Sequence, residues 1–473
     1  MKRLLIFLFP FIVMCQPPND KVQPAESGPP NFVIIFCDDL GYGDLSSFGN
    51  PTIRTPNLDR MAAEGQKWTQ FYVADPVCTP SRSALMTGRY PIRTGMTSKE
   101  RAVLFPDSGS GLQHEEITIA EVLKQKDYAT AAIGKWHLGH LPQYLPMAQG
   151  FDSYFGIPYS NDMDAVPGMW PYYHEKKADP NFFPEIKNYN VPLMEGEKVI
   201  ERPADQTTIT RRYTERAIEY IKANKDNPFF LYLAHSLPHI PLFASAEFVG
   251  SSKRGLYGDV LQEIDSGVGQ ILQTLRDLNL DNNTIVLFTS DNGPWLAFDT
   301  HGGSAGPLRA GKGTTFEGGQ RVPTIFWGPG IVQPGIVTEM GSTLDMINTL
   351  AAFAGAEVPA DRKMDGYDLS PVIRGTGKSP RTDFYYWAFA ELHAVRSGPW
   401  KLHIQQREPI HYSNIAKMEG PELYNIEADI SEKYDRAEAK PEVVDDLHLM
   451  IEKHLSDVEG STPDQLGIRI ENE

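Results

Sequence analysis

Oxygen-bearing side chains follow two apolar runs of the sequence. Asp38 and Asp39 come directly after the first run, and Ser290, Asp291 and Asn292 come directly after the second. Carboxylate and amide oxygens are hard ligands that suit Ca²⁺ or Mg²⁺ and not Zn²⁺. An Asp pair after a strand is more often a turn or a helix cap than a metal site, but two such clusters favour a metal. We therefore expect a divalent-cation site where the two runs end.

The segment 76–88 combines a thiol with a cation at the start of a predicted helix. Pro80 and Ser81 suit the first turn of a helix that runs toward Gly88, which places Cys78 at its N-terminus. The dipole and the free N–H groups of that end favour an anion, and Arg82 adds a positive charge one turn later. The segment therefore predicts an anion site at Cys78. A reactive or merely buried thiol is the simpler alternative.

Apolar runs that alternate with helical segments predict an α/β fold with a mostly parallel central sheet flanked by helices. The runs do not alternate with polar residues, as expected of strands covered on both faces; they span residues 31–37, 128–133, 229–234, 284–289 and 323–327. The predicted helices span residues 57–65, 118–126, 207–224, 258–278 and 342–354. Ligands of such sheets collect beyond the carboxyl ends of the strands, which is where the oxygen ligands lie.

Two segments depart from this alternation. Residues 158–203 are rich in Pro, Tyr and Asn and predict a long surface excursion that could wall a substrate cleft. After about Gly355, short strands and one helix are predicted at 384–389, 394–404, 422–426 and 441–455. We therefore expect a catalytic domain over residues 31–360 and a smaller C-terminal α+β subdomain over 361–473.

The N-terminus has the pattern of an export signal. Two basic residues precede the apolar run 4–14, which is too short to span a bilayer and ends at Cys15. Residues 16–30 are polar and Pro-rich, like a tether. We interpret residues 1–15 as a lipoprotein-type signal with Cys15 lipidated, and plain cleavage is the alternative. This interpretation implies export to the periplasm or the outer-membrane surface of a Gram-negative bacterium.

The composition is that of a globular protein, with 41% hydrophobic and 22% charged residues. The formal net charge of −17 argues against a nucleic acid or an anionic membrane surface as partner. A site for an anion must then be locally basic or hold a metal. Three cysteines are too few for a disulfide framework. A Cys37–Cys78 bridge is conceivable, but Cys37 ends an apolar run and is better explained as a small buried hydrophobe.

Two motifs resemble the signatures of a known enzyme family. Residues 78–88, Cys-Thr-Pro-Ser-Arg followed by Ser-Ala-Leu-Met-Thr-Gly, are similar to the signature of the formylglycine-dependent sulfatases, in which a maturation enzyme oxidises the cysteine to an aldehyde. Residues 134–139, Gly-Lys-Trp-His-Leu-Gly, resemble the second signature, although Asp127 stands where a glycine is usual. The resemblance runs from about Asn31 to the segment 423–425 and is nearest to the arylsulfatase A and N-acetylgalactosamine-6-sulfatase branch. It implies the alkaline-phosphatase-like fold.

The resemblance also implies a role for each matched residue. One calcium ion would be held by Asp38, Asp39, Cys78 in its modified form, Asp291 and Asn292. The residues that would steady the aldehyde hydrate and take its proton are Arg82, Lys135 and, as general base, His137. His239 and Lys312 would bind the sulfate and help to protonate the leaving oxygen. His239 is preferred to His235 because the histidine of the family precedes an x-Pro pair.

The implied chemistry suits a sulfate ester, whose sulfur is screened by negatively charged oxygens. Calcium and the neighbouring cations would offset that charge in the transition state. Sulfur is a poor ligand for calcium, whereas an aldehyde hydrate carries two hydroxyls on one carbon. One hydroxyl attacks sulfur, and the other loses its proton to His137 as sulfate is expelled.

Contacts to the rest of the substrate are expected from the long excursion and from the loop before Lys312. The candidates are Asp164, Trp170, Tyr173, His174, His301 and Arg309. A loop with aromatic and charged side chains suits sugar binding, although a packing or solvated role is equally open for each residue. The expected substrate is a sulfated polysaccharide or oligosaccharide, such as a glycosaminoglycan, carrageenan, ulvan or fucoidan fragment, cut from the chain end.

Two alternatives stand beside a sulfatase. A phosphomonoesterase or phosphodiesterase of the same superfamily would use two transition metals and an unmodified hydroxyl, but the sequence lacks a second obvious Asp/His cluster. A non-catalytic carbohydrate-binding lipoprotein would be expected to have lost site residues, whereas every matched position is filled. The modified cysteine adds a transient partner, the formylglycine-generating maturation enzyme.

Overall fold

The computed structural model describes residues 28–408 and 414–470, so the predicted signal and most of the predicted tether lie outside the described residues. The strands of the main sheet are β1 (Asn31–Cys37), β2 (Gln66–Tyr72), β3 (Ala129–Gly134), β4 (Ser153–Gly156), β5 (Leu193–Glu195), β6 (Lys198–Glu201), β7 (Phe229–Ala234), β8 (Thr284–Ser290), β9 (Thr324–Trp327) and β10 (Gly335–Ser342). They form one ten-stranded sheet in the order β10-β2-β9-β8-β1-β7-β3-β4-β5-β6.

The middle of this sheet is parallel and its flanks are mixed. β8, β1, β7, β3 and β4 run parallel to one another, whereas β9 is antiparallel to both neighbours and β5 and β6 form an antiparallel hairpin on β4. Every residue of β1, β7 and β8 is buried, as their uninterrupted apolar sequences predict. The predicted α/β fold is confirmed, and the sheet, predicted as mostly parallel, is parallel in its middle and mixed overall.

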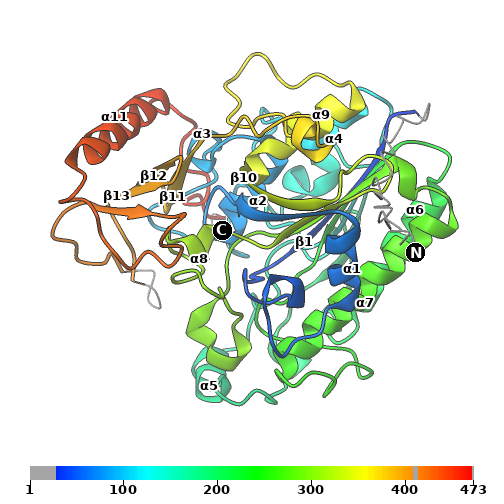
Figure 1. Ribbon diagram of the computed structural model, residues 1–473. Coiled ribbons are helices and arrows are strands. Elements are labelled where there is room, and N and C mark those ends of the chain that lie inside the picture. The colour runs from blue at the N-terminus through cyan, green and yellow to red at the C-terminus, as the bar shows by residue number, and fades with distance from the viewer. Residues whose placement is uncertain (1–27, 409–413, 471–473) are drawn as a thin grey trace, which may run out of the picture.

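Helices cover both faces of the sheet (Figure 1). One face packs against α1 (Pro56–Glu64), α6 (Ile209–Ala223) and α7 (Leu256–Asp277). The other packs against α2 (Cys78–Thr87), α4 (Ile119–Lys124), α9 (Met346–Ala354) and α10 (Ser370–Ile373). The remaining helices are α3 (Pro91–Thr94), α5 (Met169–Lys176), α8 (Glu317–Gln320) and α11 (Pro441–Asp457). Short 3₁₀ helices lie at Ser46–Phe48, Pro142–Tyr144, Pro146–Gln149, Ile186–Asn188, Asp281–Asn283, Leu296–His301 and Thr343–Asp345.

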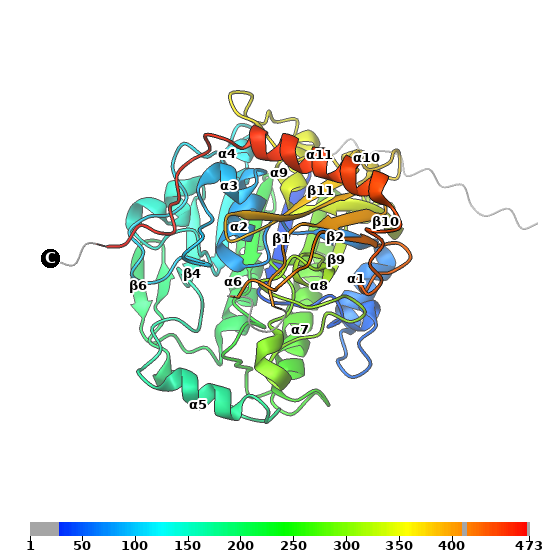
Figure 2. The ribbon, with the colours of Figure 1, turned by 90° about the vertical axis from the view of Figure 1, so that its left-hand side faces the viewer.

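The C-terminal part forms a second, antiparallel sheet of β11 (Asp383–Ala388), β12 (Glu391–Ser397), β13 (Trp400–His403) and β14 (Glu422–Asn425), in that order. α11 packs on it (Figure 2), with Leu447 and Ile451 in the same buried cluster as the strands. The predicted strand 394–404 is therefore two strands, because the chain turns at Gly398 with a φ of 54°. Among the described residues, none of the helices is long and apolar enough to cross a membrane.

Some elements differ from the sequence prediction. The excursion 158–203 is not irregular throughout, because it contains α5 and the β5–β6 hairpin that extends the main sheet. The strands β2 and β10 were not predicted; β2 has polar residues at several positions and is only partly buried. The predicted helix 342–354 is shorter, since Ser342 ends β10 and α9 begins at Met346.

Candidate active site

The candidate site lies at the carboxyl ends of four neighbouring parallel strands. The pairing register joins Phe36 of β1 to Ala234 of β7, Ala234 to Gly134 of β3, and Cys37 to Ser290 of β8, so the four strands end at the same level. The segments that follow carry most of the predicted site, and α2 supplies the rest. The predicted residues brought together there are Asp38, Asp39, Cys78, Arg82, Lys135, His137, His239, Asp291, Asn292 and Lys312, each at most 5% exposed.

The N-terminus of α2 points its first residue, Cys78, at the end of β1. Val77 precedes the helix in an extended conformation, and Gly88 ends it in the left-handed region with its N–H bonded to the Ala84 carbonyl. The predicted helix and its glycine stop are confirmed. Cys78 Sγ lies 3.2 Å from Asp38 Oδ1, and both Cys37 and Cys78 are free thiols. The conceivable Cys37–Cys78 bridge is therefore absent, and Cys37 is a buried core residue as expected.

Four of the site residues could hold a metal ion together. One ligand atom from each of Asp38, Asp39, Cys78 and His239 lies within 4.8 Å of the others. Consecutive side chains of a strand point to opposite faces, but Asp39 has a φ of 63°, and this left-handed turn lets its carboxylate join that of Asp38. His239 was predicted to bind sulfate, and the structure places it beside the carboxylates of the candidate metal site as well.

The two predicted ligands after β8 contact this group through Asp39. Asn292 donates to Asp39 Oδ1 at 2.7 Å, while its own Oδ1 is buried and has no hydrogen-bond partner in the described part of the chain. Asp291 accepts the Asp39 N–H at 3.1 Å on one oxygen and Arg82 at 2.7 Å on the other. The hard oxygens fit a divalent cation such as calcium, and an oxygen at position 78 would fit it better than sulfur.

Three buried cations surround the carboxylates. Arg82 donates through Nε and Nη2 to Asp291, and Lys135 Nζ bonds Asp38 Oδ2 at 2.5 Å. Lys312 Nζ lies 2.7 Å from Asp39 Oδ1. These three cations balance the charges of Asp38, Asp39 and Asp291, so a bound divalent cation would give the site the net positive charge that suits an anion within a protein of net charge −17.

Burial and the neighbouring charges shift the pKa values of Asp38 and Asp39 in opposite directions. Burial acts to raise the pKa of Asp38, but Lys135 and the other cations outweigh it and hold that pKa well below its ordinary value. Burial raises the pKa of Asp39 to about 7, and the charges of Asp38 and Asp291 add to the rise against the opposing effect of Lys312. A bound divalent cation would favour the ionised form of all three.

The thiol of Cys78 is poorly suited to act as a nucleophile itself. Burial, and after it the charge of Asp38, raises the pKa of the Cys78 thiol well above its ordinary value. The thiolate and not the thiol is the reactive form, so this side chain stays protonated and inert at neutral pH. The alternative of a reactive cysteine is disfavoured.

His137 is arranged as a proton acceptor. Its Nε2 lies 2.9 Å from the Leu104 carbonyl, an acceptor, so Nε2 carries the proton and Nδ1 is left with a lone pair. Nδ1 is buried and has no hydrogen-bond partner among the residues that the structure covers. Burial, and next the charge of Lys135, lowers the pKa of His137 well below its ordinary value, which keeps the ring neutral. The Thr79 hydroxyl fixes the backbone of His137 beside α2 at 3.0 Å.

The residues predicted to contact the rest of the substrate lie in other settings. Both ring nitrogens of His301 are engaged, by the Tyr173 hydroxyl at 2.7 Å and the Asp179 carbonyl at 3.0 Å, so His301 braces α5. Asp164 pairs with Arg202 at 2.9 Å. The aromatic rings of Trp170 and His174 pack on Phe298, and Arg309 donates to the Glu432 carbonyl. Contact of these residues with substrate stays a prediction.

Two site neighbours were not predicted. Ser160 accepts a hydrogen bond from Lys135 Nζ at 3.2 Å, and Oδ1 of Asp162 is buried without a hydrogen-bond partner within the described ranges. Lys135 and Lys312 both act on the pKa of Asp162, although burial is the larger effect and raises it. Both residues follow β4, so the rule that polar residues after a strand matter would have found them had that strand been recognised.

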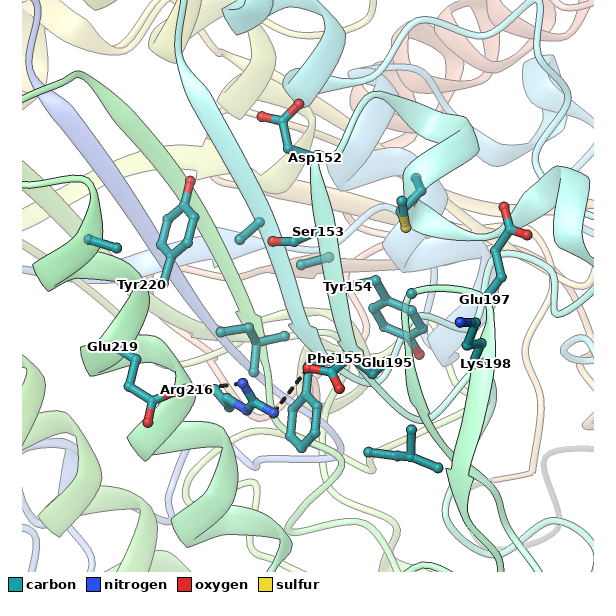
Figure 3. Close-up of a pocket in the computed structure, with 17 residues that line it drawn as sticks. Asp152, Ser153, Tyr154, Phe155, Glu195, Glu197, Lys198, Arg216, Glu219 and Tyr220 are labelled. Carbon is teal, nitrogen blue, oxygen red and sulfur yellow. Dashed lines mark hydrogen bonds and ion pairs between the residues drawn. The ribbon is translucent and has the colours of Figure 1, made fainter.

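A separate hollow of about 770 Å³ lies between α6 and the β5–β6 hairpin (Figure 3). Its lining includes Tyr154, Phe155 and Tyr220, and Arg216 forms ion pairs with Glu195 at 3.0 Å and Glu219 at 3.7 Å beside it. None of the residues gathered at the strand ends lines it. The chemistry described above therefore belongs to the strand ends and not to this hollow.

Comparisons with known proteins agree with the geometry. The Sulfatase family model matches residues 30–356, and the model for the C-terminal region of aryl-sulfatase matches residues 379–469. Arylsulfatase A of Bos taurus is 41% identical over 445 residues, which cover 89% of this chain and 85% of the bovine protein. N-acetylgalactosamine-6-sulfatase of Canis lupus familiaris is 42% identical over 387 residues, covering 79% of this chain and 72% of the canine protein.

A solved structure shows the same architecture. Ps i-CgsB in complex with k-i-k-neocarrahexaose superposes with a TM-score of 0.77 at 32% identity, over 94% of this chain and 95% of that one. Taken with the site, these matches define the class as sulfuric ester hydrolases. The chain belongs to the sulfatase family.

Proposed function

We propose that this protein hydrolyses the sulfate ester of a sulfated carbohydrate, with Cys78 oxidised to formylglycine and one calcium ion bound beside it. The observation that carries the proposal is the state of Cys78: a buried, protonated thiol at a helix N-terminus, 3.2 Å from a carboxylate and ringed by cations. A sulfur atom there neither attacks an ester well nor suits calcium, whereas oxygen does both.

The oxidised side chain would supply two hydroxyls on one carbon, one to attack sulfur and one to release sulfate again. His137 has a neutral ring with a free lone pair on Nδ1, which can take a proton from such a hydroxyl. Lys135 and Arg82 hold that end of the site by their bonds to Asp38 and Asp291.

Lys312 and His239 lie beside Asp39, where they could contact the sulfate oxygens. Lys312 Nζ is 2.7 Å and His239 Nε2 is 3.6 Å from this carboxylate. His239 Nδ1 donates to the Ile240 carbonyl, which leaves Nε2 directed at the site. In this position Lys312 can bind the anion and pass a proton to the leaving oxygen, and His239 can do so only in its doubly protonated form, because its neutral ring carries the proton on Nδ1.

Calcium would be held by Asp38, Asp39, Asp291, Asn292 and the modified Cys78, and would supply Lewis-acid stabilisation of the charge that develops on the sulfate. The orphaned Oδ1 of Asn292 supports this assignment, because a buried amide oxygen without a donor is costly unless a cation binds it.

A carbohydrate substrate is supported by the relatives. Ps i-CgsB binds k-i-k-neocarrahexaose, and N-acetylgalactosamine-6-sulfatase is named for an amino-sugar sulfate. We further propose exo-action on an oligosaccharide and an exported, lipid-anchored location at Cys15, as the sequence of residues 1–15 suggests.

The test measures the mass of the purified protein and its release of free sulfate. Protein made with a formylglycine-generating enzyme should show the mass of an aldehyde or its hydrate at Cys78, and should release free sulfate from one or more sulfated mono- or oligosaccharides. The Cys78→Ala variant should fold and release none. An active preparation whose Cys78 is an intact thiol would refute the mechanism. Release of phosphate from phosphate esters in preference to sulfate would favour the phosphoesterase alternative.

A further inference from the structure

The loop that carries Lys312 is held by the C-terminal subdomain. Gly318 N–H donates to the Arg309 carbonyl at 2.8 Å and closes the loop. Arg309 in turn donates to the Glu432 carbonyl at 2.7 Å, and the Ser431 hydroxyl donates to the Pro307 carbonyl at 2.6 Å. The first half of the loop is therefore hydrogen-bonded to residues 431 and 432, which follow β14.

The second half of the loop is held by one buried lysine. Lys401 of β13 donates from Nζ to the Thr315 carbonyl at 2.8 Å and pairs with Glu317 at 3.0 Å and Glu432 at 2.9 Å. Glu432 also accepts the Glu317 N–H at 2.7 Å. Lys401, Glu317 and Glu432 are all 0% exposed, so no solvent shares these bonds.

Stability alone does not account for this arrangement. A buried ion pair gains little over apolar side chains of the same size, because both charges must leave water. The bond from Lys401 to the Thr315 carbonyl fixes the backbone three residues from Lys312, and the two ion pairs hold Lys401 in place to make it. The Lys312 and Gly313 N–H groups are fixed as well, each 2.9 Å from the carbonyls of Pro294 and Pro76. Groups that act on a substrate must be held within about 0.5 Å.

We propose that Lys401 is a positioning residue for Lys312, so that the C-terminal sheet sets the sulfate-binding geometry of the catalytic domain. The inference rests on the proposed function, because it takes Lys312 to bind the sulfate group. It adds a role for the C-terminal subdomain: its β13 lysine never touches substrate, yet it determines where the substrate-binding lysine stands.

The test is a double-mutant cycle read as sulfate affinity. In purified full-length protein, Lys401→Met should raise the inhibition constant of inorganic sulfate and the KM for a sulfate ester about tenfold, a free-energy change within the range of coupled residues. The same substitution made in a Lys312→Ala background should change sulfate affinity less than about twofold. Because Lys401→Met leaves two carboxylates facing each other, the charge-balanced pair Lys401→Met with Glu432→Gln is made in parallel.

The matched control is Arg381→Met. Arg381 is also buried in the C-terminal part and pairs with Asp345, but its bonds go to the segment before α9 and to the Asp365 carbonyl. It should lower the melting temperature without changing the inhibition constant of sulfate. Two results would overturn the inference. One is a change in sulfate affinity on Lys401→Met that is equal in the wild-type and Lys312→Ala backgrounds. The other is a rise in the inhibition constant of sulfate in Arg381→Met as large as that in Lys401→Met.

The two proposals fail separately. Sulfate binding is also measured by calorimetric titration of the free protein, so the role of Lys401 is tested without turnover. Wild-type protein that binds sulfate and shows the coupling but cleaves no ester contradicts only the proposed reaction. Active wild-type protein with additive substitutions contradicts only the role of Lys401.

Discussion

At the scale of single residues, the direction of one hydrogen bond gives His137 its chemistry. Because Nε2 donates to the Leu104 carbonyl, Nδ1 is the acceptor, and burial beside Lys135 keeps the ring from being protonated. For Cys78 the effect of burial has the opposite sign, because it raises the pKa of the thiol and makes it a weaker acid. The same low dielectric thus produces a neutral imidazole and an inert thiol within one site, which supports the proposal that oxidation of the cysteine activates it.

The first prediction concerns the general base. We expect His137→Ala to lower kcat on an aryl sulfate by about 10²–10⁴-fold, the usual contribution of a positioned base, with little change in KM. His235→Ala is the matched control, because His235 is equally buried and its Nδ1 also lacks a partner in the described chain. Steady-state kinetics on folded protein decide. A kcat for His137→Ala within tenfold of wild type would contradict the assignment.

The second prediction concerns calcium. A ligand that binds only the folded state stabilises it by about 2.7 kcal/mol at a concentration one hundred times its dissociation constant. We therefore expect chelation to lower the melting temperature and abolish turnover, and added Ca²⁺ to restore both. In the Asp39→Asn variant the melting temperature should no longer respond to Ca²⁺. A melting curve of wild-type protein that is the same with chelator and with Ca²⁺ would remove the metal from the proposal.

At the scale of elements, some strands and the site residues that follow them could be predicted from the sequence, and others could not. β1, β7 and β8 could be located because both faces of each are apolar, and the polar residues after β1 and β8 were recognised for that reason. β2 and β4 could not be located from the sequence. About half of the residues of β2 are polar, and β4 has only four residues, of which the first, Ser153, is exposed. Ser160 was missed with β4, and Lys401 was missed because its loop partners, Thr315 and Glu317, lie more than eighty residues away in sequence.

The third prediction tests how β3 delivers Lys135. Gly134 ends β3 with a φ of 108°, and a Cβ there would lie 1.8 Å from the Ala234 carbonyl of β7. Gly134→Ala must therefore push the two strands apart. It should lower the free energy of unfolding by about 3 kcal/mol and, because it moves Lys135, lower kcat/KM further than the stability loss explains.

Gly355→Ala is the control for this effect. Gly355 also has a positive φ, 66°, at the end of α9, but nothing lies within 4 Å of its added Cβ. Only backbone strain remains, so we expect a loss of about 1 kcal/mol and unchanged kinetics. Urea unfolding and kinetics on both variants make the comparison. Equal losses of stability would mean that the contact between β3 and β7 is not what the glycine protects.

At the scale of the whole molecule, the two sheets act as one unit. Both sides of their boundary contribute buried charges, with Arg381 of the C-terminal part on Asp345 and Lys401 on Glu317. The sequence predicted the subdomain as an appended unit because its strands are short and its composition changes after Gly355. Which charges face each other across a boundary depends on tertiary packing, so this coupling could not be predicted.

The last prediction follows from a buried histidine in this second unit. His454 of α11 accepts a hydrogen bond from Trp387 Nε1–H at 3.1 Å and stacks on Tyr385, so its ring must be neutral in the folded protein. Burial, and then Arg93, lowers the pKa of His454 to about 3. In the unfolded chain the ordinary histidine pKa is about 6.5, so the unfolded state binds one more proton between these two values.

The sign of the pH effect follows. The contribution of His454 to stability is complete above a pH of about 6.5 and is lost as the pH falls toward 3, at up to about 1.4 kcal/mol per pH unit. Between pH 7 and pH 5 the stability advantage of wild type over His454→Gln should therefore shrink by about 2 kcal/mol. Urea unfolding of both proteins at the two pH values measures it. Parallel curves, with a constant difference between wild type and variant, would show that the buried ring binds its proton as readily folded as unfolded.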